Sequence, residues 1–141
     1  MPNFDAKDFY SLALKIANTF PNEAGYRTAV GRAYYACHLV GEDSTVQKGW
    51  FHPDHGATDH RGLSKVFRDH SLVSISDKLR ELIELREHVD YHMSKSTTEH
   101  CSYCELVKGD SPLVDETTWK RAKALADDLL PRLESIKPSI K

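Results

Sequence analysis

The chain has 141 residues, of which 40% are hydrophobic and 28% charged, and its formal net charge is -2. These values are typical of one folded domain and exclude both general disorder and a globally basic surface for nucleic acid. No apolar run approaches the roughly 20 residues that cross a bilayer, and the opening MPNFDAKDFY lacks the pattern of a secretion signal. Three cysteines, an odd number, argue against a disulfide framework. We therefore predict a single cytoplasmic domain over residues 1–141, with its core between about 5 and 136 and no membrane partner.

The first two predicted helices cover residues 4–20 and 23–40. In the second helix, Tyr34 and Tyr35 point about 100° apart, so one can lie in the core while the other lines a surface. Cys37 falls on the apolar side and is expected to be a small buried residue. The first helix carries an apolar stripe that predicts core packing: Phe9, Leu12, Ala13, Ile16, Ala17 and Phe20.

Residues 41–58 break the helical pattern and are expected to form a long loop. Trp50 and Phe51 in this loop favour a hydrophobic lid on the helices, because large apolar groups are costly to leave in water. The alternative is an exposed surface that binds a partner or stacks on bases. A third, shorter helix follows at 59–72.

A long helix with a clear inner face is predicted at 76–93, with Ser74 or Ser76 as its N-cap. A second long connection, 94–115, precedes a last helix at about 116–136. The apolar seam of this last helix is Trp119, Ala122, Ala126, Leu129, Leu133 and Ile136. No segment alternates with a period of two, so the predicted fold is all-α, an antiparallel bundle of four to five helices with two long loops.

Cys101 and Cys104 are separated by two residues, a spacing that lets both thiolates bind one zinc ion. A structural site needs four ligands, which histidines could complete: His100, His92, His88, His52 and His55. The alternative is a reduced cysteine pair in a loop without metal. Zinc therefore stays a possible cofactor, while the leading hypothesis requires none.

Arg86 and His92 are the minimal equipment for cleaving RNA without metal. A histidine can move a proton to or from the 2′-hydroxyl or the leaving oxygen, and an arginine can hold the phosphate. His92 comes six positions after Arg86, which puts the two residues about 120° apart around an ideal helix. A shared site therefore needs long side chains, an irregular helix or a second protomer. The alternative interpretation pairs Arg86 with Asp90 as a buried ion pair and leaves His92 exposed.

Three segments together resemble HEPN domains: GRAYYACHLV at 31–40, DHRGLSKVF at 59–67 and LRELIELREHVDYH at 79–92. They are most similar to the small stand-alone branch, which has an Arg-Ala-Tyr-Tyr-Ala helix, a His-x-Gly segment and a late Arg…Asp-Tyr motif. The order and spacing of the helices match over about residues 5–136. The resemblance implies an antiparallel helical bundle that commonly forms a homodimer through the helices bearing these motifs.

Many HEPN proteins are metal-independent endoribonucleases, often toxins or defence components. Their signature is an Arg and a His separated by four to six residues, in a cleft where two protomers meet. Arg86 and His92, with five residues between them, fit this signature as catalytic residues, and a dimer would bring the partner's residues into the cleft. The residues expected to support this site are Asp90, Tyr91, Tyr35 and His88.

The resemblance also implies a rival function. Asp90-Tyr91 is characteristic of relatives without evident nuclease chemistry, which partner a small nucleotidyltransferase or act as binding modules. Glu87 departs from the nuclease pattern, because that position frequently holds Asn or another small polar residue. Three hypotheses follow. The first is an endoribonuclease that acts on RNA, with a cognate antitoxin as a candidate partner. The second is a non-catalytic module partnering a nucleotidyltransferase, and the third is a zinc-binding helical protein built on Cys101, Cys104 and His100.

Overall fold

The computed structural model describes residues 5–54, 59–91 and 114–136, without the side chains of Asp90 and Tyr91. The described residues contain no strand, and the prediction of an all-α fold with four to five helices is confirmed. The helices are α1 (Lys7–Thr19), α2 (Glu23–Gln47), α3 (Asp59–Asp69), α4 (Val73–Tyr91) and α6 (Glu116–Ser135). None of the helices in these ranges is both long and apolar enough to span a membrane.

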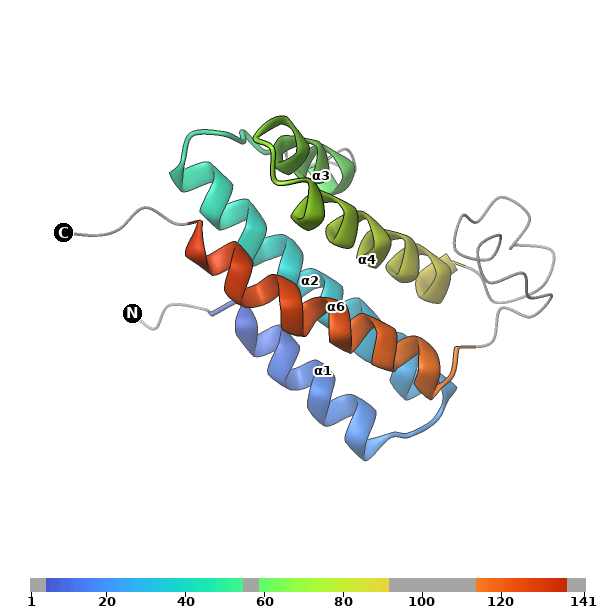
Figure 1. Ribbon diagram of the computed structural model, residues 1–141. Coiled ribbons are helices and arrows are strands. Elements are labelled where there is room, and N and C mark those ends of the chain that lie inside the picture. Colours follow the sequence, from blue (N-terminus) through green and yellow to red (C-terminus); the bar gives the residue numbers. More distant parts are fainter. Residues whose placement is uncertain (1–4, 55–58, 92–113, 137–141) are drawn as a thin grey trace.

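Helix α2 is the centre of the bundle, since it packs against α1, α3, α4 and α6 (Figure 1). Helix α6 lies along α2 and also contacts α4, whereas α3 packs mainly on α4. A short turn at Phe20–Asn22 reverses the chain between α1 and α2, and the Asn22 side chain caps α2 by accepting from the Gly25 N–H at 2.9 Å.

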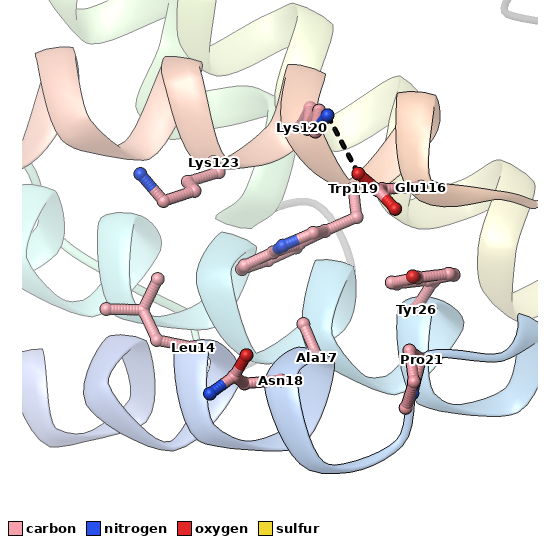
Figure 2. Close-up of a pocket in the computed structure, with 9 residues that line it drawn as sticks. All are labelled: Leu14, Ala17, Asn18, Pro21, Tyr26, Glu116, Trp119, Lys120 and Lys123. Atoms are coloured by element: carbon pink, nitrogen blue, oxygen red, sulfur yellow. Dashed lines mark ion pairs between the residues drawn. The ribbon is translucent and has the colours of Figure 1, made fainter.

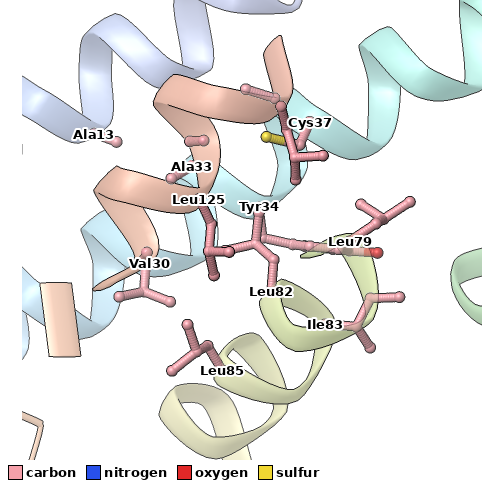
Figure 3. Close-up of a cluster of buried hydrophobic side chains, with 14 of the residues drawn as sticks. Ala13, Val30, Ala33, Tyr34, Cys37, Leu79, Leu82, Ile83, Leu85 and Leu125 are labelled. Atoms are coloured by element: carbon pink, nitrogen blue, oxygen red, sulfur yellow. The ribbon is translucent and has the colours of Figure 1, made fainter. Parts of the chain in front are cut away.

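The core forms where α2, α4 and α6 meet (Figure 3). Small residues on α2 let the other helices approach closely, and larger aliphatic side chains of α4 and α6 fill the space between them. The buried side chains at this contact include Val30, Ala33, Tyr34 and Cys37 of α2, Leu79, Leu82, Ile83 and Leu85 of α4, and Leu125 of α6. The predicted seam of α6 is buried from Trp119 to Leu133.

The prediction of a loop beginning at residue 41 is wrong, because α2 continues to Gln47. Gly41 is buried where a Cβ would already touch Leu133 and Leu63 at 3.4 Å, so only a small residue fits beside α6 and α3. The Ser44 hydroxyl donates to the Leu133 carbonyl at 2.8 Å, and the Thr45 hydroxyl donates to the Gly41 carbonyl at 2.8 Å. The tertiary contacts of Gly41 and Ser44 with α6 and α3 therefore help keep this stretch of weak helix formers helical.

Trp50 and Phe51 fold back onto the helices, as expected for a lid. Phe51 is buried beside Gly62 of α3. The Trp50 ring stacks on the His70 ring, with their centroids 3.8 Å apart and their planes 14° apart. His52 is exposed, and His55 lies outside the described residues.

Helix α4 begins at Val73, so neither Ser74 nor Ser76 is its N-cap. Ser76 is instead buried, with its hydroxyl 3.1 Å from that of Ser64 on α3. A turn with Ser71 at a φ of 63° ends α3 early, at Asp69. The α3–α4 contact thus buries the hydroxyl that the sequence suggested as a cap.

The apolar stripe of α1 is only partly buried. Ala13 and Ala17 lie in the core, but Leu12 is 44% and Phe20 is 55% exposed, so the prediction that the whole stripe packs inward is wrong. Helix α1 lies at one edge of the bundle and contacts mainly α2, with a smaller contact to α6 (Figure 1). One main helix neighbour covers only a narrow strip of its surface.

Candidate functional site

Aromatic, imidazole and guanidinium groups of three helices gather beside the core. Tyr34, Tyr35 and His38 come from α2, His60 from the first turn of α3, and Arg86 from α4. The ring centroids of His38 and His60 are 4.6 Å apart, and the Tyr34 centroid lies 5.8 Å from the first and 5.6 Å from the second. We call these five residues the histidine cluster.

Tyr34 connects the members of the cluster. Its side chain is fully buried, and its hydroxyl is hydrogen-bonded to Nδ1 of His60. The Arg86 Cζ lies 5.8 Å from the Tyr34 ring centroid, within the range of a cation–π contact. Tyr35 is half-buried with its ring 6.1 Å from that of Tyr34, so the prediction that these tyrosines divide between core and surface is confirmed.

Both histidines of the cluster are held neutral by their surroundings. Burial lowers the pKa of His38 to about 4, and His60 and Arg86 act in the same direction. Burial and the charge of Arg86 also lower the pKa of His60. The cluster thus places neutral imidazoles beside a permanent cation at pH 7.

His38 has one ring nitrogen bonded and one not. Its Nε2 lies 3.3 Å from the Glu42 carboxylate, one helical turn further along α2. Its Nδ1 is buried and has no hydrogen-bond partner among the described residues. Such an atom costs free energy, because burial removes its water without replacing the bond.

The charge of Glu87, next to Arg86, is offset within the structure. The Glu87 carboxylate pairs with the Arg61 guanidinium at 2.9 Å across α4 and α3. Arg32 supplies a second cation beside Tyr35 of the histidine cluster. Its Cζ is 5.7 Å from the Tyr35 ring centroid and 5.4 Å from that of Phe9. Two arginines, Arg86 and Arg32, therefore lie beside aromatic rings of the cluster, and the nearby carboxylate of Glu87 is already paired with Arg61.

The structure brings together two of the residues that the sequence nominated, Arg86 and Tyr35, through Tyr34. His88 is buried at 2% exposure. The backbone of Asp90 and Tyr91 forms the end of α4, and their side chains are not described. His92, His100, Cys101 and Cys104 all lie outside the described residues.

Sequence reasoning missed His38 and His60 as partners of Arg86. A signal for His38 was available, because it follows Tyr34 by four residues and so lies on the same face of the helix. His60 stands in the DHRGLSKVF segment, but its approach to α2 depends on how α3 packs. Within the described ranges, no three His, Cys, Asp or Glu side chains are grouped so that they could hold a metal ion.

Cys37 belongs to the core rather than to the site, as expected. Burial raises the pKa of its thiol, so the reactive thiolate is suppressed. In a Cys101→Ser, Cys104→Ser variant, which keeps Cys37 as its one cysteine, we expect almost no reaction with Ellman's reagent in the native state. Full reaction is expected in concentrated guanidinium, and rapid reaction without denaturant would contradict this burial.

No family model, curated protein or solved structure matches this chain.

Proposed function

We propose that the protein is a metal-independent endoribonuclease of the HEPN type. The observation that carries the proposal is the meeting of Arg86 and His60 on the Tyr34 side chain, which puts a permanent cation next to a neutral imidazole. Substrate RNA would supply the phosphate and the attacking 2′-hydroxyl. The motif resemblance of residues 31–40, 59–67 and 79–92 supports the same function.

The reaction needs one group to hold charge and others to move protons. Arg86 binds a non-bridging phosphate oxygen and stabilises the charge that develops there. A neutral histidine accepts the 2′-hydroxyl proton as the 2′-oxygen attacks phosphorus. The 5′-oxygen leaves with a proton, which yields a 2′,3′-cyclic phosphate and a 5′-hydroxyl end.

Two histidines are candidates for the proton transfers. His92 has the family spacing from Arg86, and in a homodimer the His92 of either protomer could enter the cleft. His60 belongs to the same chain as Arg86 and contacts the same tyrosine. We propose His92 as the acid/base of the signature and His60 as a further proton-transfer group.

The second candidate function is a non-catalytic binding module that partners a nucleotidyltransferase. The internal bonding of the site favours it: Tyr34 is hydrogen-bonded to His60, Glu42 contacts His38, and Glu87 pairs with Arg61. Polar groups that are bonded to one another form a rigid network, which suits a fixed binding surface better than groups that have to transfer protons.

Cleavage of RNA in excess chelator distinguishes the two functions. We expect the wild-type protein to cleave and to leave 2′,3′-cyclic phosphate ends. Arg86→Ala and His92→Ala should each reduce the rate by about a hundredfold or more, and His60→Ala by about tenfold or more, because each removes charge stabilisation or proton transfer.

Arg80→Ala is the matched control, because Arg80 is an exposed arginine of the same helix, six positions earlier. It should cleave at the wild-type rate. Equal cleavage by the Arg86, His92 and Arg80 variants would overturn the assignment of the site. No cleavage of any of several RNAs by the wild type would favour the binding module.

A further inference from the structure

A cavity of about 460 Å³ lies between α1, the start of α2 and the start of α6 (Figure 2). No residue of α3 or α4 lines it, so it is separate from the histidine cluster. Its volume is within the range of about 300 to 1,000 Å³ that is usual for sites of small molecules. The functions proposed above do not use it.

Five of the nine residues that line the cavity are apolar or aromatic, and four are polar or charged. Leu14 and Ala17 of α1 form one side, and the indole ring of Trp119 on α6 lies across from them (Figure 2). Pro21 and Tyr26 close the end next to the α1–α2 turn. These surfaces suit the flat apolar body of a small aromatic molecule.

Three neutral polar groups on the lining are unused within the described structure. Trp119 and Tyr26 are only 6% and 8% exposed, yet neither the indole N–H nor the phenol hydroxyl is bonded to a described residue. The indole nitrogen and the phenol oxygen both keep some contact with solvent. Among the described residues, His38 Nδ1 is the one side-chain nitrogen or oxygen that is fully buried and has no hydrogen-bond partner. The Asn18 amide, also on the lining, is likewise unpaired among the described residues.

Two lysines add positive charge to the same lining. The Lys120 ammonium pairs with Glu116 at 2.7 Å, and the Lys123 ammonium pairs with Asp127 at 2.9 Å. Exposed ion pairs of this kind contribute little to the stability of the fold, so either lysine can leave its acid and turn toward a bound anion at a small cost in free energy. Donor groups around the cavity thus outnumber the single lining acid, Glu116.

We propose that this cavity binds a small planar aromatic anion. The ring occupies the apolar space against Trp119, and its carboxylate, sulfonate or phosphate group receives hydrogen bonds from Lys120, Lys123 and the neutral donors. The site does not depend on the nuclease function, because it uses different helices.

The test uses 8-anilinonaphthalene-1-sulfonate and its uncharged counterpart, N-phenyl-1-naphthylamine. In a Trp50→Phe variant, Trp119 is the one remaining tryptophan, so energy transfer from tryptophan shows that the probe binds near Trp119, and the lysine variants then assign it to the cavity. We expect saturable binding of one sulfonate probe with strong transfer. The neutral probe should bind at least about tenfold more weakly, a difference of about 1.4 kcal/mol.

Charge reversal at the cavity supplies the second arm. Lys123→Glu should weaken binding of the sulfonate probe by about tenfold. Lys65→Glu is the matched control, since Lys65 also pairs with an acid four positions later, Asp69, but lies on α3. It should leave the affinity within about twofold.

The proposal is overturned if no sulfonate probe binds with transfer from Trp119, if the neutral probe binds as tightly, or if the two lysine variants bind alike. Lys123→Glu is expected to leave RNA cleavage unchanged. Loss of probe binding with intact cleavage therefore separates this site from the nuclease, and failure of either proposal can be recognised without the other.

Discussion

Gly25→Ala is expected to lower the free energy of unfolding by about 3 kcal/mol. A Cβ at position 25 would fall on the Phe20 carbonyl oxygen and lie 2.8 Å from the Phe20 Cβ. Both obstacles belong to the short turn between α1 and α2, and the Gly25 N–H is fixed there by Asn22. Since a backbone carbonyl cannot rotate away as a flexible side chain would, α1 has to move off α2, its main neighbour.

Gly62→Ala is the matched control for this substitution. Gly62 is also helical, but a Cβ there would meet only Phe51, at an ordinary contact distance of 3.7 Å. Better helix propensity should then stabilise the protein by up to about 1 kcal/mol. Urea denaturation of both variants measures the difference, and a Gly25→Ala protein as stable as the wild type would show that α1 does not need this close approach.

Acidification is expected to remove up to about 3 kcal/mol of stability through His38 alone. The pKa of His38 is lowered to about 4 in the folded protein, against 6.5 as its ordinary value. Above pH 6.5 the imidazole is neutral in both states and contributes no pH dependence. Between pH 6.5 and 4 the unfolded chain binds a proton that the folded chain does not, so stability falls as the pH falls through this window.

The charges around His38 explain this direction. Burial dominates, and His60 on α3 and Arg86 on α4 oppose protonation, while Asp59 favours it. The Glu42 carboxylate at Nε2 also favours the charged form, but it does not outweigh the burial of the ring. The Nδ1 atom has no hydrogen-bond partner among the described residues, so none of them supplies an acceptor for a second N–H.

His38→Leu separates this contribution from the carboxylates that also titrate in acid. The pKa values of Glu23 and Asp128 are lowered by their hydrogen bonds, so the wild type and the variant both lose that stability in acid. We expect the variant to lose less stability than the wild type between pH 6.5 and 4, measured by urea denaturation at several pH values. His52→Gln, at an exposed position, should keep the wild-type slope, and parallel slopes for all three proteins would contradict a neutral buried His38.

The helices could be predicted from the sequence because their apolar residues recur every three or four positions. The same rule failed at residues 41–47, where Gly41, Ser44 and Thr45 look like loop residues. Ser44 is held in the helix by the carbonyl of Leu133, 89 positions away, and local sequence cannot show such a contact. The prediction that Leu12 and Phe20 are buried failed for a different reason. Periodicity shows which face of a helix is apolar, but it does not show how much of that face other helices cover.

The candidate site could be predicted only in part. Arg86 was nominated because an arginine can hold the phosphate during RNA cleavage and because its spacing from His92 fits the signature of the family that the sequence resembles. Tyr35 was nominated because one of two neighbouring helical tyrosines can line a surface. His38 lies one helical turn after Tyr34 on α2, so a local signal for it existed. That His60 joins them depends on the packing of α3 against α2, which has no local signature. His92, Cys101 and Cys104 remain predictions, as does the HEPN resemblance itself.

The order in which the helices meet has a consequence for folding kinetics. Helices α1 and α2, and likewise α3 and α4, are neighbours along the chain and can pair with little loss of chain entropy. Helix α6 instead fills its place against α2 and α4 across a long separation, and it supplies Leu129 and Leu133 to the core. We expect closing that distance to be the slow, entropically unfavourable step, with the two helix pairs forming first and α6 docking last.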